Sequence, residues 1–126
     1  MFRSLTTLVL TTLLASSVSA GELRHYDAAA FAAAQVRNAP IIIHVTAPWC
    51  PTCQAQRPIV QSLADDPSKP DLIVFDVDFD SQKDVLQTFG VRQQSTLIAF
   101  RGVEERTRAV GITDPAAIAA LFGATD

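Results

Sequence analysis

Two cysteines three residues apart, placed between a predicted strand and a predicted helix, constrain the fold of this chain more than any other feature. Cys50 and Cys53 are the only cysteines among its 126 residues. The segment before them, 40–46, is short, apolar and rich in isoleucine, which predicts a strand covered on both faces. In the segment after them, 54–63, apolar residues recur at helical spacing. The order is therefore strand, cysteine pair, helix.

The position of Cys50 predicts a reactive sulfur. A residue that precedes a proline avoids the α region, and Pro51 is well tolerated at the first helical position, so Cys50 should be the helix N-cap. Free N–H groups and the positive end of the helix dipole stabilise a thiolate there. Cys53 lies one turn into the helix, within reach of a disulfide. We expect Cys50 to attack and Cys53 to resolve; the alternative is a structural clip, although so small a loop removes little unfolded-state entropy.

Residues 1–20 predict a secretory signal peptide. A single charge, Arg3, precedes the apolar run 5–15, and the small residues 16–20 follow, with cleavage expected after Ala20. The run is short for a membrane span, although an uncleaved anchor is an alternative. The mature chain would be residues 21–126, a single domain in the periplasm with no stable membrane insertion. Its nine basic and thirteen acidic residues give a net charge of −4, with no basic run to indicate nucleic-acid binding.

Beyond the cysteine pair, predicted strands and helices alternate along the chain. Strands are expected at 22–26, 40–46, 71–78, 96–101 and 104–110, and helices at 28–37, 50–63 and 115–122. A further helix should end at Phe89, with Ser81 and Asp84 as its capping arrangement. Asp27 and Asp114 are the expected N-caps of two other helices. The order β-α-β-α-β-α-β-β-α predicts an α/β fold with a mixed central sheet flanked by helices.

With these elements in place, the chain resembles the thioredoxin family over essentially all of residues 22–126. The resemblance rests on APWCPTC at 47–53, on Pro58 five residues after the second cysteine, and on FGVR at 89–92 leading to the strand from Thr96. It implies the thioredoxin fold and a thiol–disulfide oxidoreductase that exchanges disulfides with protein substrates through a mixed disulfide. With the predicted signal peptide, this oxidoreductase would be exported. No cofactor is implied, because two-electron chemistry on the sulfurs needs none. The active-site and substrate-binding surface would then include Trp49, Pro51, Thr52, Ser95 and Thr96.

Two residues depart from the family pattern. Ser95 stands where the family has a cis-proline, and because a cis bond before another residue costs about 3–4 kcal/mol, we expect a trans Gln94–Ser95 bond and a reshaped loop. That change should alter substrate release or specificity, unless Ser95 is simply a tolerated loop residue. His44 stands where the family has a buried aspartate. It could take the proton of Cys53, or it could be a neutral histidine hydrogen-bonded inside the sheet.

The direction of the exchange is predicted from the residues between the cysteines. Neither Pro51 nor Thr52 is basic, which favours a reductase recharged by a membrane-bound electron donor over a strong oxidant of exported proteins. A metal-binding or metal-carrier protein using the cysteine pair is the other alternative, since the family's proline normally keeps metals away. One chain has too few ligands for a closed zinc site, so we expect no metal. We also expect a monomer.

Overall fold

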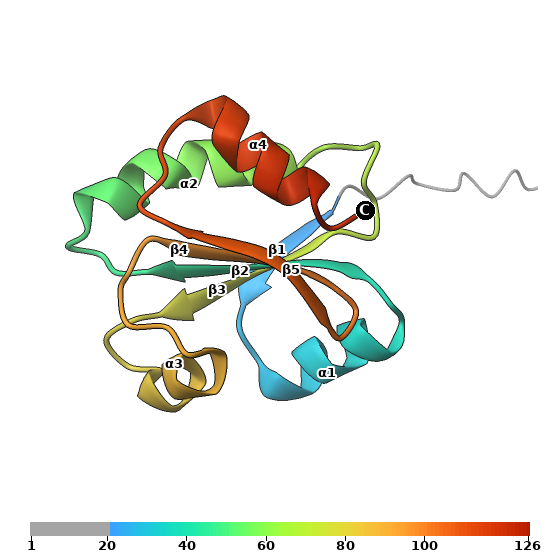
Figure 1. The fold of residues 1–126 in the computed structure, drawn as a ribbon, viewed down its shortest axis with the longest axis horizontal. Coiled ribbons are helices and arrows are strands. Elements are labelled where there is room, and N and C mark those ends of the chain that lie inside the picture. Colours follow the sequence, from blue (N-terminus) through green and yellow to red (C-terminus); the bar gives the residue numbers. More distant parts are fainter. Residues whose placement is uncertain (1–20) are drawn as a thin grey trace, which may run out of the picture.

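A five-stranded mixed sheet lies between two pairs of helices in this computed structural model, which describes residues 21–126. Helices α1 and α3 cover one face and α2 and α4 the other (Figure 1). The predicted signal peptide, 1–20, lies outside the described residues. The strands are β1 (Glu22–His25), β2 (Pro40–Thr46), β3 (Ile73–Asp78), β4 (Thr96–Arg101) and β5 (Glu104–Val110). The helices are α1 (Ala28–Val36), α2 (Pro51–Ala64), α3 (Lys83–Phe89) and α4 (Pro115–Gly123). The predicted element order and the mixed sheet flanked by helices are thereby confirmed.

The strand order, β1-β3-β2-β4-β5, brings three distant segments to one edge of the sheet. β3 runs parallel to β1 and β2, whereas β4 runs antiparallel to both β2 and β5. The ends of β2 and β3 therefore lie beside the beginning of β4. As a result, the cysteine pair after β2, the turn after β3 and the loop before β4 meet at the same place.

Every residue of β2 is buried, as its apolar sequence predicts for a strand covered on both faces. Alternate side chains point to opposite faces. Ile41 and Ile43 pack with α1 and α3, while Ile42 packs with α2 and α4. Each isoleucine removed from water in this way contributes roughly 1.5–3 kcal/mol, so β2 anchors the segment that carries the cysteines. None of the helices within residues 21–126 is long and apolar enough to cross a membrane.

The helix starts follow the predicted caps in two cases and not in a third. Asp27 accepts the N–H of Ala30 at 2.8 Å at the start of α1, and Asp114 caps α4 in the same way. The prediction that Ser81 caps α3 is wrong, because α3 begins at Lys83 without a side-chain cap bond. The Ser81 hydroxyl instead donates to Asp78 at 2.7 Å within the turn that leaves β3, so it is not available to the helix.

Candidate active site

A disulfide joins Cys50 and Cys53 where β2 passes into α2. Cys50 has extended backbone angles, φ −90° and ψ 108°, and is the N-cap of α2, with Pro51 at the first helical position. Its Sγ accepts the N–H of Cys53 at 3.1 Å. The predicted N-cap is thus confirmed, and the N–H groups at the helix start are placed to stabilise a Cys50 thiolate once the pair is reduced.

Both cysteines are buried, and Phe79 packs against the cluster that they form with Ala47. Trp49 is 56% exposed, and its ring meets Phe79 edge-on with the centroids 6.3 Å apart. The indole N–H of Trp49 donates to Asp80 at 2.8 Å. Trp49 therefore lies on the surface beside the disulfide, held in place by the turn after β3. Asp80 is a residue of this site that the sequence pattern did not identify; the available signal was its place just after a strand whose end meets the cysteine pair.

The loop before β4 has an unusual residue conformation at Ser95. This residue has φ +59° and is buried, and no peptide bond within residues 21–126 is cis, which confirms the expected trans bond. The Ser95 N–H donates to the Val45 carbonyl at 2.8 Å, and its hydroxyl donates to the Gln94 carbonyl at 2.6 Å. Thr96 donates to the Gln93 carbonyl at 2.7 Å. A proline has neither this N–H nor a positive φ, so the loop conformation depends on a residue other than proline.

His44 is buried on the side of the sheet that α2 covers. It lines a small hollow together with Pro58 of α2. Its Nε2 lies 2.9 Å from the side-chain oxygen of Gln56. Burial is the main cause that lowers the pKa of His44, while the hydrogen bond to Gln56 acts in the opposite direction. Within residues 21–126 no hydrogen bond joins its ring to either sulfur. The structure therefore shows a histidine hydrogen-bonded inside the protein, and its role in proton transfer stays a prediction.

Gln56 is a second residue at this site that the sequence pattern did not identify. It is fully buried on α2, and its amide reaches His44 and the carbonyls of Ser95 and Ile112. The only signal was a glutamine at a helical position, three residues after Cys53, that should face the sheet. A buried polar side chain needs such partners, because without them its desolvation would be costly.

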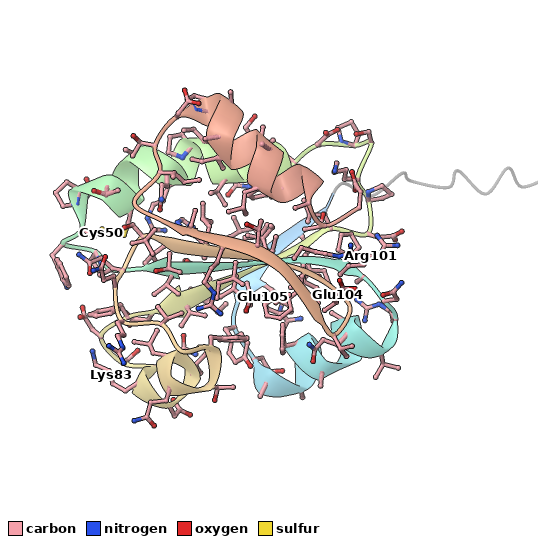
Figure 2. All side chains as sticks on the ribbon, viewed as in Figure 1. Cys50, Lys83, Arg101, Glu104 and Glu105 are labelled. Carbon is pink, nitrogen blue, oxygen red and sulfur yellow. A yellow bond between two sulfur atoms is a disulfide. The ribbon has the colours of Figure 1, made fainter. Side chains whose placement is uncertain are left out.

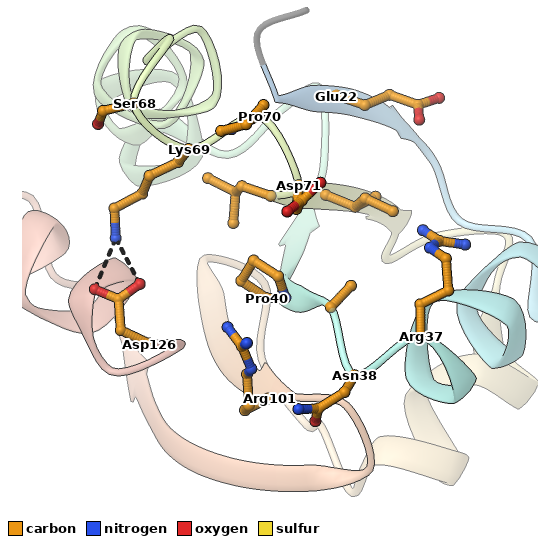
Figure 3. Close-up of a pocket in the computed structure, with 13 residues that line it drawn as sticks. Glu22, Arg37, Asn38, Pro40, Ser68, Lys69, Pro70, Asp71, Arg101 and Asp126 are labelled. Carbon is orange, nitrogen blue, oxygen red and sulfur yellow. Dashed lines mark hydrogen bonds and ion pairs between the residues drawn. The ribbon is translucent and has the colours of Figure 1, made fainter.

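A second hollow, of about 530 Å³, lies at the opposite end of the sheet from the disulfide (Figure 3). Figure 2 shows this separation, with Cys50 at one end of the sheet and Arg101, which lines the hollow, at the other. Neither cysteine nor histidine lines it, and Lys69 there already binds both carboxylate oxygens of Asp126 at 3.0 and 3.1 Å. Over the described part of the chain, no three His, Cys, Asp or Glu side chains are grouped to hold a metal ion. The two cysteines, which can exchange disulfides, lie at the other end of the sheet, and that end is the candidate active site.

Comparisons with known protein families, sequences and structures all point to the same family. The Thioredoxin family profile matches residues 22–123. A thioredoxin H-type of Brassica oleracea is 37% identical over 79 residues, which is 63% of this chain and 63% of the plant protein. The crystal structure of Trxlp from Edwardsiella tarda is 43% identical with a TM-score of 0.77, covering 79% of this chain and 97% of that one. A mutant thioredoxin of Halobacterium salinarum is 25% identical with a TM-score of 0.70, covering 84% and 92%.

Proposed function

This chain belongs to the thioredoxin family, and we propose that it is exported and reduces disulfides of periplasmic proteins. The predicted thioredoxin fold is confirmed, and so is a disulfide oxidoreductase with a redox-active pair. The observation that carries the proposal is the Cys50–Cys53 disulfide at the N-cap of α2, beside the exposed ring of Trp49. Export, direction and partners are the parts that go beyond family membership.

The exchange proceeds in two balanced steps. The Cys50 thiolate attacks a substrate disulfide, so that a Cys50–substrate bond forms while the substrate bond breaks and one substrate thiolate leaves. Cys53 then loses its proton and attacks the Cys50 sulfur, forming the Cys50–Cys53 bond and releasing the second substrate thiolate. The substrate gains the two electrons that the cysteine pair loses. A membrane-bound electron donor would return them, since an exported pair otherwise tends to stay oxidised.

His44 is the candidate base for the Cys53 proton. Burial lowers its pKa from the unperturbed value of about 6.5, so the ring is neutral and able to accept a proton at working pH. The ring has no direct hydrogen bond to the sulfur, so transfer would run through an intervening water. A His44→Ala variant should resolve the mixed disulfide more slowly and with a changed pH profile. Unchanged rate and profile would remove His44 from the reaction.

The direction of exchange rests on the residues between the cysteines. Pro51 and Thr52 add no positive charge to stabilise the Cys50 thiolate, which favours a reductant. The test is the reduction potential of residues 21–126, by equilibration with glutathione or dithiothreitol. A reduction potential of about −270 mV supports a reductase, whereas one of about −120 mV would make the protein an oxidant. Failure to form the disulfide, together with bound metal in protein purified without chelator, would favour the metal-carrier alternative.

Export rests on the charge, apolar run and small residues of the first twenty positions. Expression of the full chain in a bacterium, followed by cell fractionation and intact mass, tests it. The expected product is periplasmic and begins at Gly21. An unprocessed chain that stays in the cytoplasm would contradict both export and the periplasmic location.

A further inference from the structure

The amide of Gln56 connects three parts of the site that are distant in the sequence. This side chain is fully buried on α2, one turn after Cys53. Its Nε2 lies 3.2 Å from the Ser95 carbonyl and 2.8 Å from the Ile112 carbonyl, and its Oε1 lies 2.9 Å from His44 Nε2. Ser95 precedes β4 and Ile112 follows β5, so Gln56 holds two loops and one strand together.

These contacts determine which nitrogen of His44 carries the proton. The carbonyls of Ser95 and Ile112 only accept, so both N–H bonds of the Gln56 amide are used there. The amide oxygen then faces His44, and because it also only accepts, His44 Nε2 must donate. In the neutral ring the lone pair is therefore at Nδ1.

His44 lines a small hollow, and its Nδ1 atom is accessible to solvent. Within residues 21–126, Nδ1 has no hydrogen-bond partner. Every fully buried side-chain nitrogen or oxygen in the same residues does have a partner, so Nδ1 cannot be fully buried. The hollow, of about 270 Å³, is lined by His44, Arg57, Pro58 and Asp76 among others. A proton can reach Nδ1 by this route without any change in the Gln56 amide.

The charged groups that face His44 come from two elements. Asp76 lies beside it on β3 and favours the charged ring, whereas Arg57 on α2 disfavours it. The two side chains pair with each other at 3.7 Å, which reduces the effect of each. The neighbour on β4 is Leu97, which is apolar. The hydrogen bond that His44 donates to Gln56 is thus the contact that orients the ring.

We propose that Gln56 is a positioning residue: it holds His44 with Nδ1 as the proton-accepting atom and clamps the Ser95 and Ile112 loops beside the disulfide. Because Nε2 donates to Gln56 in both the neutral and the charged ring, protonation at Nδ1 leaves the loops in place. One side chain thus sets both the orientation of the candidate base and the backbone next to which a substrate docks. The proposal rests on the function proposed above, but its first test does not depend on activity.

The tautomer of His44 is measured in the oxidised protein by long-range nitrogen–proton correlation spectra, with a His25→Gln background to simplify assignment. The wild-type ring should be in the Nε2–H form above its titration midpoint. In Gln56→Met, which keeps the length but removes all three hydrogen bonds, a fraction of the Nδ1–H form should appear beside the intrinsically preferred Nε2–H form, and the midpoint should move to lower pH. A wild-type Nδ1–H ring, or an unchanged midpoint in Gln56→Met, would overturn the proposal.

A second variant separates the two tasks of Gln56. Gln56→Glu keeps an acceptor for His44 but has no N–H for Ser95 or Ile112, so the Nε2–H tautomer should persist with a raised midpoint. Both variants should raise KM for a protein disulfide at least threefold, with a smaller effect on kcat, because the docking loops lose their clamp. Gln87→Met, an exposed change on α3, is the matched control and should leave both constants unchanged. Wild-type KM in both Gln56 variants would contradict the clamp, whereas an inactive wild type with the expected tautomer would contradict only the proposed function.

Discussion

Replacing Ser95 by proline restores the residue that is usual in the thioredoxin family, and we expect it to destabilise this chain. Ser95 has φ +59°, whereas proline is held near φ −65°. The Ser95 N–H also donates to the buried Val45 carbonyl at 2.8 Å, and proline has no N–H. The substitution therefore removes a hydrogen bond and forces the loop to rebuild.

The expected cost follows from these two changes. A buried carbonyl left without its donor costs about 1–3 kcal/mol. Rebuilding the backbone around one incompatible residue adds on the order of 1–3 kcal/mol, the usual size of single-residue strain. Ser95→Pro should therefore lower the free energy of unfolding by at least about 2 kcal/mol. Ser95→Gly is the matched control, because glycine keeps the N–H and adopts positive φ readily, so it should stay within about 1 kcal/mol of wild type.

Urea unfolding of the oxidised domain, followed by far-ultraviolet circular dichroism, measures both variants. If Ser95→Pro is as stable as the wild type, the positive φ and the Val45 hydrogen bond do not determine this loop. An equal loss in Ser95→Gly would show that the hydroxyl, and not the backbone, is responsible.

Three further outcomes are expected from the structure. Burial lowers the pKa of His44, so as the pH falls the unfolded chain binds a proton at this residue before the folded chain does. The free energy of unfolding should therefore keep its full contribution from His44 above about pH 6.5 and decrease below it. In His44→Asn, urea unfolding should show a less steep decrease. Gly102→Ala should destabilise more than Gly111→Ala, because both have positive φ but a Cβ at Gly102 would lie 2.6 Å from the Asn38 side-chain oxygen, while at Gly111 it meets nothing within 4 Å. Alkylation of reduced Cys50 by iodoacetamide should have its pH midpoint below about 8.5, returning to that value in urea.

The sequence predicted those parts of the fold that depend on local pattern. The bounds of β2, β4 and β5 agree with the expected ranges, because each lies between clear turn residues or beside a proline. The N-cap at Cys50 was predictable from one adjacent residue, Pro51. The caps at Asp27 and Asp114 were predictable for the same reason, since a capping side chain bonds within its own first turn.

What the sequence did not predict depends on contacts between distant residues. The hydrogen bond from Gln56 to Ile112 joins residues 56 apart, and the bond from Trp49 to Asp80 joins residues 31 apart. Neither periodicity nor propensity indicates such partners. Ser81 was expected to cap α3, but Asp78 takes its hydroxyl. The trans bond at Ser95 followed from the cost of the cis form, whereas its positive φ accompanies a hydrogen bond to Val45, fifty residues away, that no local pattern indicates.

Trapping of the mixed disulfide tests whether Cys50 and Cys53 carry out the exchange in the roles assigned here. The Cys53→Ser variant should attack a protein disulfide and remain bound to it. Mass spectrometry should then find one substrate sulfur on Cys50, in an adduct that dithiothreitol releases. Cys50→Ser should give no adduct, because Cys53 lies one turn inside α2 and lacks the N-cap position that stabilises a thiolate. An adduct through Cys53, or none from Cys53→Ser while the wild type reduces the same substrate, would contradict these roles.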